Sequence, residues 1–217
     1  TQMDQQVQKD LVEKITHRYP EDRIFAEEDG LRSPISEGSV WVIDPIDGTN
    51  NFVTQKEDFA VMVAYFEDGI GQFGLIYDVM RDHLFYGGGE FPVYRNEVEL
   101  TPFVDQPLEN FLIASNVGML EKNDWGMADL GMDSLGIRVY GSAGISFSKI
   151  LSGGILAYFS YIWPWDYAAA AIMGEQLGYT VLNLNGDKPN YQSVEPIMMV
   201  PKVKLTEIQT YLKKGRS

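Results

Sequence analysis

The stretch "WVIDPIDGTNNF" (Trp41–Phe52) sets an apolar run against two aspartates, Asp44 and Asp47, and follows them with a Gly-Thr pair. Val40–Ile43 predicts a strand that ends at Asp44-Pro45, because proline cannot donate to a β-ladder. Pro45 also fixes its φ at about −65°, so a stiff turn can aim both carboxylates at one point. Two unpaired carboxylates would repel each other there, whereas a divalent cation would attract both. The stretch therefore predicts a cation site at the end of a strand.

The composition limits the ligands and partners of such a site. None of the 217 residues is cysteine, which excludes thiolate ligands and disulfides and favours a reducing cytoplasm. With only two histidines, His17 and His83, the ligands must be mainly oxygen, which favours magnesium, manganese or calcium over zinc. A net charge of −14 repels phosphate backbones, so no nucleic acid partner is expected. No apolar run approaches the roughly 20 residues that cross a bilayer, and no secretory leader opens the chain, so we expect a cytoplasmic protein without membrane contact.

Local patterns predict strands that cluster early and strand–helix units that follow. A helix is expected over Met3–Pro20, with its apolar stripe at Met3, Val7, Leu11 and Ile15. Phe59–Gly88 predicts a three-stranded meander. Further strands are expected within Arg23–Gly30, Val93–Leu100, Asn110–Asn116, Ile137–Gly154, Ile155–Ile162 and Ile197–Val200, and further helices within Met119–Asp133, Ile137–Gly154, Pro164–Gly178 and Thr206–Leu212. This order predicts a layered α/β architecture in a single domain, residues 1–217, with approximate halves 1–105 and 106–217.

Acidic residues also stand at two other ends of predicted elements. Glu27 and Glu28 follow the strand that starts near Arg23, and Asp166 lies in the first turn of the helix at Pro164–Gly178. Ends of this kind are where polar groups reach a ligand. Taken singly, each acidic residue has a structural alternative as a turn former or helix cap. The joint pattern favours one site.

The residues after Asp47 suit phosphate chemistry. Gly48 lets the backbone approach a ligand closely, and N–H groups at the start of a helical turn bind phosphate oxygens. The hydroxyl of Thr49 can orient a water. A carboxylate cage beside such a turn is typical of metal-assisted hydrolysis of phosphate esters. By contrast, Trp163 and Trp165 are expected to serve packing.

Two similar motifs fail on spacing. A calcium EF-hand needs acidic ligands at alternate positions and a Glu at the twelfth; counted from Asp44, the third residue is Ile46 and the twelfth is Gln55. Aspartyl-phosphate phosphatases of the haloacid dehalogenase type end a strand with Asp-x-Asp-Gly-Thr. Here Pro45 stands two residues before Asp47, so the nucleophile of that class is absent.

The motifs "WVIDPIDGTNNF", "AEED" upstream and "PWDYAAA" downstream closely resemble the inositol monophosphatase family of magnesium-dependent, lithium-sensitive phosphatases. The resemblance spans most of the chain. It implies the αβαβα sandwich of the inositol monophosphatase and fructose-1,6-bisphosphatase superfamily, a homodimer, and one or more N-terminal helices ahead of Thr1.

The resemblance also implies the roles of the site residues. Glu27, Asp44, Asp47, Asp166 and the carbonyl of Ile46 match ligands of two or three Mg²⁺, for which Mn²⁺ could substitute, with Glu28 a weaker match. Thr49 and Glu27 match the groups that position the attacking water, and Asp47 belongs to the same catalytic set. The phosphate and substrate contacts implied are Asp47, Gly48, Thr49, Gly141, Ser142, Ala143 and Asp166.

Two departures concern the substrate. A Glu that touches a ring hydroxyl in animal relatives corresponds to Ser160, and "AAAA" replaces the usual Ala-Ala-Gly after Trp-Asp. We therefore expect a phosphoric monoester hydrolase of the inositol-1-phosphatase type, acting on inositol monophosphate or related small esters by direct attack of metal-activated water. The alternatives are a fructose-1,6-bisphosphatase, an NADP or nucleotide phosphatase, or a non-catalytic protein that binds metal and phosphate. Asp47→Asn is expected to lower activity steeply and to change the fold little.

Overall fold

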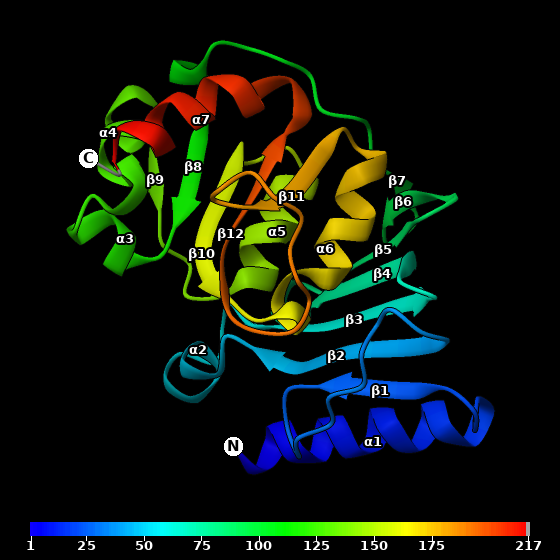
Figure 1. The fold of residues 1–217 in the computed structure, drawn as a ribbon. Helices are drawn as coiled ribbons and strands as arrows, with labels where there is room; N and C mark the ends of the chain where they lie inside the picture. Colours follow the sequence, from blue (N-terminus) through cyan, green and yellow to red (C-terminus); the bar gives the residue numbers. More distant parts are fainter. Residues whose placement is uncertain (216–217) are drawn as a thin grey trace.

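The computed structural model describes residues 1–215, whose strands form two sheets (Figure 1). The first sheet has the strand order β1-β2-β3-β4-β5-β6-β7 and the second the order β11-β12-β10-β8-β9. The strands of the first sheet are β1 (Arg23–Ala26), β2 (Ser39–Asp47), β3 (Ala60–Glu67), β4 (Ile70–Asp78), β5 (His83–Gly88), β6 (Phe91–Arg95) and β7 (Val98–Glu99). Those of the second are β8 (Leu112–Ser115), β9 (Gly136–Arg138), β10 (Ala157–Ile162), β11 (Tyr179–Asn183) and β12 (Glu195–Pro201).

The helices lie in three layers, outside and between these sheets (Figure 1). They are α1 (Gln2–Arg18), α2 (Thr49–Thr54), α3 (Val117–Glu121), α4 (Met127–Asp133), α5 (Ala143–Leu151), α6 (Pro164–Gln176) and α7 (Leu205–Lys214). Short 3₁₀ turns are η1 (Val79–Arg81), η2 (Leu108–Asn110), η3 (Asp124–Gly126) and η4 (Lys202–Lys204). Helix α1 covers the outer face of the first sheet, α5 and α6 lie between the sheets, and α7 with α3 and α4 covers the second sheet.

Three apolar clusters hold these layers together. Under α1, Leu11 and Ile15 pack on Ile24 and Ile43. The largest cluster joins both sheets to α5 and α6, most of whose residues are buried because these helices are covered on both sides. A third cluster packs α7 on the second sheet through Ile208 and its neighbours. The predicted αβαβα sandwich is confirmed.

Strand β2 differs from its predicted end. It continues through Pro45 to Asp47. Asp44 pairs with Met62 of β3 and Asp47 pairs with Ala60, so β2 has two residues between these pairs where β3 has one. The extra residue makes a β-bulge, which accommodates the missing N–H of Pro45 and redirects the side chains next to it. The strand that was expected to stop before the aspartates instead carries both.

Helix α1 also differs in the face that it buries. Met3 is exposed, while the polar residues Asp4 and Gln8 are buried on the same side as Leu11 and Ile15. The buried stripe is thus half polar, because its first two turns face the end of β2 and the chain after β1. The strand β11 lay outside the predicted elements. Among residues 1–215, no helix is both long and apolar enough to span a bilayer.

Candidate metal centre

The bulge of β2 brings two acidic side chains into the interior. Asp44 is 1% exposed, and its Oδ1 is one of few buried side-chain atoms in residues 1–215 that lack a hydrogen-bond partner. A buried carboxylate oxygen without a partner is unfavourable unless a cation or proton compensates it. This oxygen is therefore a candidate metal ligand.

A third carboxylate comes from the far half of the chain. Asp166 lies in the first turn of α6, where Pro164 occupies the first position of the helix. The Trp163 N–H donates to Asp166 Oδ2 over 2.7 Å and so fixes the side chain. One carboxylate oxygen from each of Asp44, Asp47 and Asp166 lies within 4.8 Å of the others, a spacing that one small cation can bridge. These three residues are called the carboxylate corner below.

Glu27 lies beside this corner. It follows β1, which pairs in parallel with β2, and its N–H donates to the Ile43 carbonyl over 3.2 Å. Its carboxyl group is within hydrogen-bond reach of Asp44 but is not one of the three that lie mutually within 4.8 Å. Glu28 is held through its backbone instead: its N–H and carbonyl both bond the side-chain amide of Gln8, each over 2.9 Å.

The four carboxyl groups disfavour one another's ionisation. Burial, and after it the charges of Asp47 and Asp166, raises the pKa of Asp44 well above its usual value. Burial and the Asp47 charge raise the pKa of Asp166 to about 8. Burial followed by the neighbouring Glu28 charge raises the pKa of Glu27. Without a cation the corner therefore retains protons near neutral pH, and an all-oxygen set of this kind fits Mg²⁺ or Mn²⁺.

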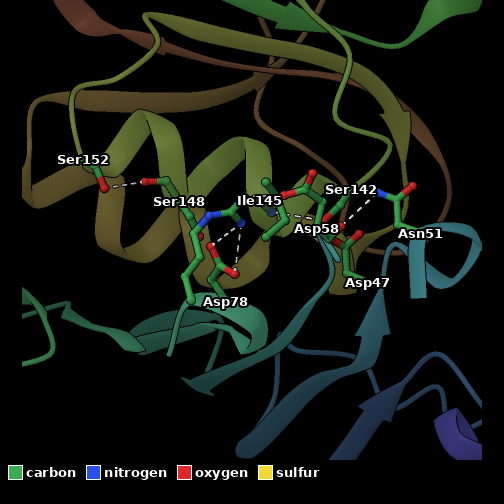
Figure 2. A network of polar contacts seen from close by, with 9 residues as sticks. Asp47, Asn51, Asp58, Asp78, Ser142, Ile145, Ser148 and Ser152 are labelled. Carbon is green, nitrogen blue, oxygen red and sulfur yellow. Dashed lines mark hydrogen bonds and ion pairs between the residues drawn. The ribbon is translucent and has the colours of Figure 1, made fainter. Parts of the chain in front are cut away.

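Asp47 has a second set of partners at the start of α5 (Figure 2). The Ser142 hydroxyl and the Gly144 N–H, at 2.7 Å, donate to Oδ2, and the Ala143 N–H donates to Oδ1 over 3.1 Å. These donors oppose the effect of burial, which on balance still raises the Asp47 pKa. Asp47 thus joins β2 to α5. Gly141 precedes this turn with φ +70°, next to the Asn51 side chain.

The turn after Asp47 positions a hydroxyl at the same end of β2. Gly48 has φ +86°, and a Cβ there would lie 2.9 Å from Ser142 Cβ. Thr49 Oγ1 is 3.1 Å from the Ile46 carbonyl and 3.1 Å from Asp4 Oδ1. The Thr49 hydroxyl has one proton, so the Ile46 carbonyl and the Asp4 carboxylate compete to accept it. The lone pairs of the hydroxyl oxygen stay free to accept a hydrogen bond from a water.

Asp4 is a site residue that the sequence prediction missed. The available signal was the spacing Asp4, Gln8, Leu11, Ile15, which repeats every three or four residues and places two polar residues in an otherwise apolar helix stripe. A buried carboxylate that contacts Thr49 is chemically informative. The predicted stripe begins at Met3 and Val7 instead and does not include Asp4.

Two further contacts arrange the surroundings of the site. The Asn51 side chain donates to the carbonyl of Asp58 over 2.9 Å (Figure 2). It also donates to the carbonyl of Tyr140 over 2.7 Å, which ties α2 to the segment before α5. Ser160 is buried on β10 and accepts from Asn116 Nδ2 over 3.2 Å. Its hydroxyl is thus engaged within the protein, and substrate contact by Ser160 stays a prediction.

Comparisons with known proteins agree with this geometry. A sequence model described as the inositol monophosphatase family matches residues 1–215. The inositol-1-monophosphatase of Bacillus subtilis is 36% identical over 193 residues, covering 86% of this chain and 73% of the relative. Human inositol monophosphatase 2 is 27% identical over 199 residues, covering 86% of this chain and 68% of that protein. Among solved structures, staphylococcal IMPase-II superposes with a TM-score of 0.91 at 31% identity, covering 97% of this chain and 82% of that one.

Proposed function

Because this chain belongs to the inositol monophosphatase family, we propose that it is a magnesium-dependent phosphoric monoester hydrolase that acts on inositol monophosphate or related small phosphate esters. The observation that carries the proposal is the carboxylate corner, with the unpartnered Asp44 Oδ1 inside it. A structural cap or turn would satisfy that oxygen within the protein. A bound cation satisfies it from outside.

We assign the metal ligands to Asp44, Asp47, Asp166 and Glu27, with the Ile46 carbonyl as a further oxygen. Two or three Mg²⁺ per site follow from the family resemblance, and Mn²⁺ is the expected substitute. When bound, such ions supply positive charge that neutralises the phosphate group and acidifies water. The raised pKa values of the corner support this assignment, because they report carboxyl groups that lack a compensating charge.

The proposed reaction is direct attack of water on phosphorus, which breaks the ester P–O bond and releases the alcohol and inorganic phosphate, without a phosphoenzyme. Thr49 accepts a hydrogen bond from the water and orients it, while Glu27 takes up a proton from it. Asp4 supports this role by accepting a hydrogen bond from the Thr49 hydroxyl over 3.1 Å. The N–H groups of Gly48 and Thr49 bind the phosphate, as the positive φ of Gly48 allows a close approach. Ser142 and Ala143 act through Asp47, whose orientation they fix together with the Gly144 N–H. A substrate contact by Gly141 is proposed from the family resemblance.

A second candidate activity is a nucleotide or NADP phosphatase. Structures of staphylococcal IMPase-II, about 30% identical to this chain, have been solved with inositol monophosphate and with 2′-AMP bound. A related IMPase/NADP phosphatase, 26% identical, has been solved with NADP and Ca²⁺. Fructose 1,6-bisphosphate is a further candidate of the same reaction class. A purely binding role is disfavoured, because the acidic set is complete.

The family resemblance extends the proposal to a cytoplasmic homodimer that lithium inhibits. Light scattering after size-exclusion chromatography tests the dimer. Inhibition of phosphate release by LiCl, with NaCl as the matched salt, tests the lithium response.

Phosphate release from a panel of esters tests the main proposal. The panel contains inositol 1-phosphate, fructose 1,6-bisphosphate, 2′-AMP, NADP and glycerol 2-phosphate, each with Mg²⁺ and with EDTA. We expect Mg²⁺-dependent hydrolysis of at least one ester and loss of it in Asp44→Asn. No release from any ester in Mg²⁺ or Mn²⁺ would favour the non-catalytic alternative. A phosphoenzyme trapped by acid quench would contradict direct attack.

A further inference from the structure

An exposed aromatic residue, Trp163, is bonded through its backbone to Asp166 of the carboxylate corner. Trp163 is 38% exposed, and its backbone N–H donates to the Asp166 carboxylate over 2.7 Å. One hydrogen bond thus links the backbone of this exposed tryptophan directly to a proposed metal ligand. The sequence led us to expect packing from this residue, and packing accounts for only part of the ring.

One face of the Trp163 ring is covered by Trp165. The two indoles are stacked, with centroids 4.8 Å apart and an interplanar angle of 9°, and Trp165 is only 4% exposed. The parallel arrangement leaves the opposite face of Trp163 as the surface that a ligand can reach. A flat aromatic face of this kind suits a planar ring, which prefers offset stacking.

The pair is held rigidly relative to the site. Phe25 contacts Trp165 edge-on at a centroid distance of 5.6 Å, and the Arg32 guanidinium lies 4.5 Å from the Trp165 ring centroid. Arg32 also donates to the carbonyl of Glu27 over 3.2 Å. The stack is therefore tied to Asp166 at one end and to Glu27 at the other. A ligand that stacks there needs no reorganisation of the ring.

We propose that Trp163 is a specificity-determining residue that stacks on the nucleobase of a nucleoside monophosphate whose phosphate lies at the carboxylate corner. The inference rests on the proposed phosphatase function and names one substrate class for it. Stacking on an aromatic side chain is open to every nucleobase, because each has a flat π-face, and it strengthens binding by about ten-fold or more. An ester without a base, such as glycerol 2-phosphate, lacks this contribution.

The test compares two esters in four proteins. The ratio of kcat/KM for 2′-AMP to kcat/KM for glycerol 2-phosphate is measured with Mg²⁺ for wild type, Trp163→Ala, Trp163→Phe and the control Tyr86→Ala. Tyr86 is also 38% exposed and stacked, on Tyr94, but it lies on β5, three strands away from β2. We expect the ratio to fall about ten-fold in Trp163→Ala, through KM for 2′-AMP, and to stay near the wild-type value in Trp163→Phe and Tyr86→Ala.

Other outcomes overturn the proposal. A Trp163→Ala ratio within about two-fold of wild type means that the pair serves packing alone, given the size of the stacking term. An equal fall in Trp163→Phe means that stacking is not the cause. If Trp163→Ala does not fold, Trp163→Leu and Trp163→Phe are compared instead, since only the second keeps a ring, and equal ratios overturn the proposal.

A binding measurement separates this inference from the proposed function. Saturation-transfer NMR detects contact between the protein and the adenine protons of adenosine, which has no phosphate to hydrolyse. We expect the adenine signal in wild type and its loss in Trp163→Ala. If no ester is hydrolysed but this difference is found, the proposed function fails and the stacking role stands. If esters are hydrolysed and wild type gives no adenine signal, the stacking role fails alone.

Discussion

Replacing Asp44 or Asp47 by asparagine removes one ionisable carboxyl group from the same buried corner, yet the two variants should differ in stability. Asp47 accepts hydrogen bonds from the N–H groups of Ala143 and Gly144 and from the Ser142 hydroxyl. In Asp47→Asn, the new NH₂ group must face at least one of these donors. Asp44 Oδ1 has no such partner to lose. The expectation that Asp47→Asn changes the fold little stays a prediction, to which these hydrogen bonds add a loss of stability.

The size of the difference follows from the lost hydrogen bond. The relief of charge repulsion is common to both variants and largely cancels when they are compared. A hydrogen bond to a charged acceptor contributes about 1.5–3 kcal/mol. The free energy of unfolding of Asp47→Asn should therefore lie about 2 kcal/mol below that of Asp44→Asn. At about 2–4 °C per kcal/mol for a chain of this size, the melting temperatures should differ by about 4–8 °C.

The assay is differential scanning calorimetry of both variants in EDTA at pH 7.5. We expect Asp44→Asn to melt at or above the wild-type temperature and Asp47→Asn clearly below Asp44→Asn. With Mg²⁺ added, wild type should gain stability and Asp44→Asn should gain little, because it has lost a ligand. Equal melting temperatures in EDTA, or a less stable Asp44→Asn, would refute the reasoning from hydrogen bonds.

Three further predictions concern charge, the hydroxyl and the turn. In the metal-free protein, burial first and the Asp47 charge second raise the pKa of Asp166 to about 8. The pKa of Asp166 is higher in the folded than in the unfolded protein, so its protonation favours folding. This contribution to the free energy of unfolding is fully present below about pH 4 and is lost as pH rises through about 8. Melting in EDTA should thus fall over this range and the gain from Mg²⁺ should grow; a flat profile would contradict the charge cluster. Thr49→Val and Asp4→Asn should each lower kcat by about 10²-fold or more, as loss of a group that orients a reacting water does, with circular dichroism unchanged; near wild-type rates would remove both from the mechanism. Gly48→Ala should lower the free energy of unfolding by about 1–3 kcal/mol in urea titrations, because φ is +86° and the new Cβ would approach Ser142; a neutral effect would show that the turn can relax.

The metal ligands could be predicted from sequence because their signals are local. Asp44 and Asp47 lie in one short stretch with proline and glycine, and Asp166 follows a proline at a helix start. Turn chemistry of this kind constrains the backbone within a few residues. The convergence of Asp166 with the other two depends on α6 packing between the sheets; the joint placement of acidic residues at element ends favoured it, and the family resemblance named the partners.

The features that were missed depend on tertiary contacts. Asp4 faces inward next to Thr49 at the end of β2, a partner that the periodicity within α1 does not identify. Strand β2 passes through Pro45 because a bulge against β3 absorbs the missing N–H. The short strand β11 is formed by its pairing with β12. In each case a neighbour in space decides what the local sequence leaves open.

The central claim is that carboxylates from β2 and α6 bind one set of small divalent cations, and anomalous diffraction from a crystal grown with Mn²⁺ tests it most directly. The account predicts an anomalous peak within coordination distance of carboxylate oxygens from Asp44, Asp47 and Asp166, and its loss in Asp44→Asn. Diffraction data with saturating Mn²⁺ and no peak at this corner, while the three carboxylates bond only to each other and to the protein, would contradict it.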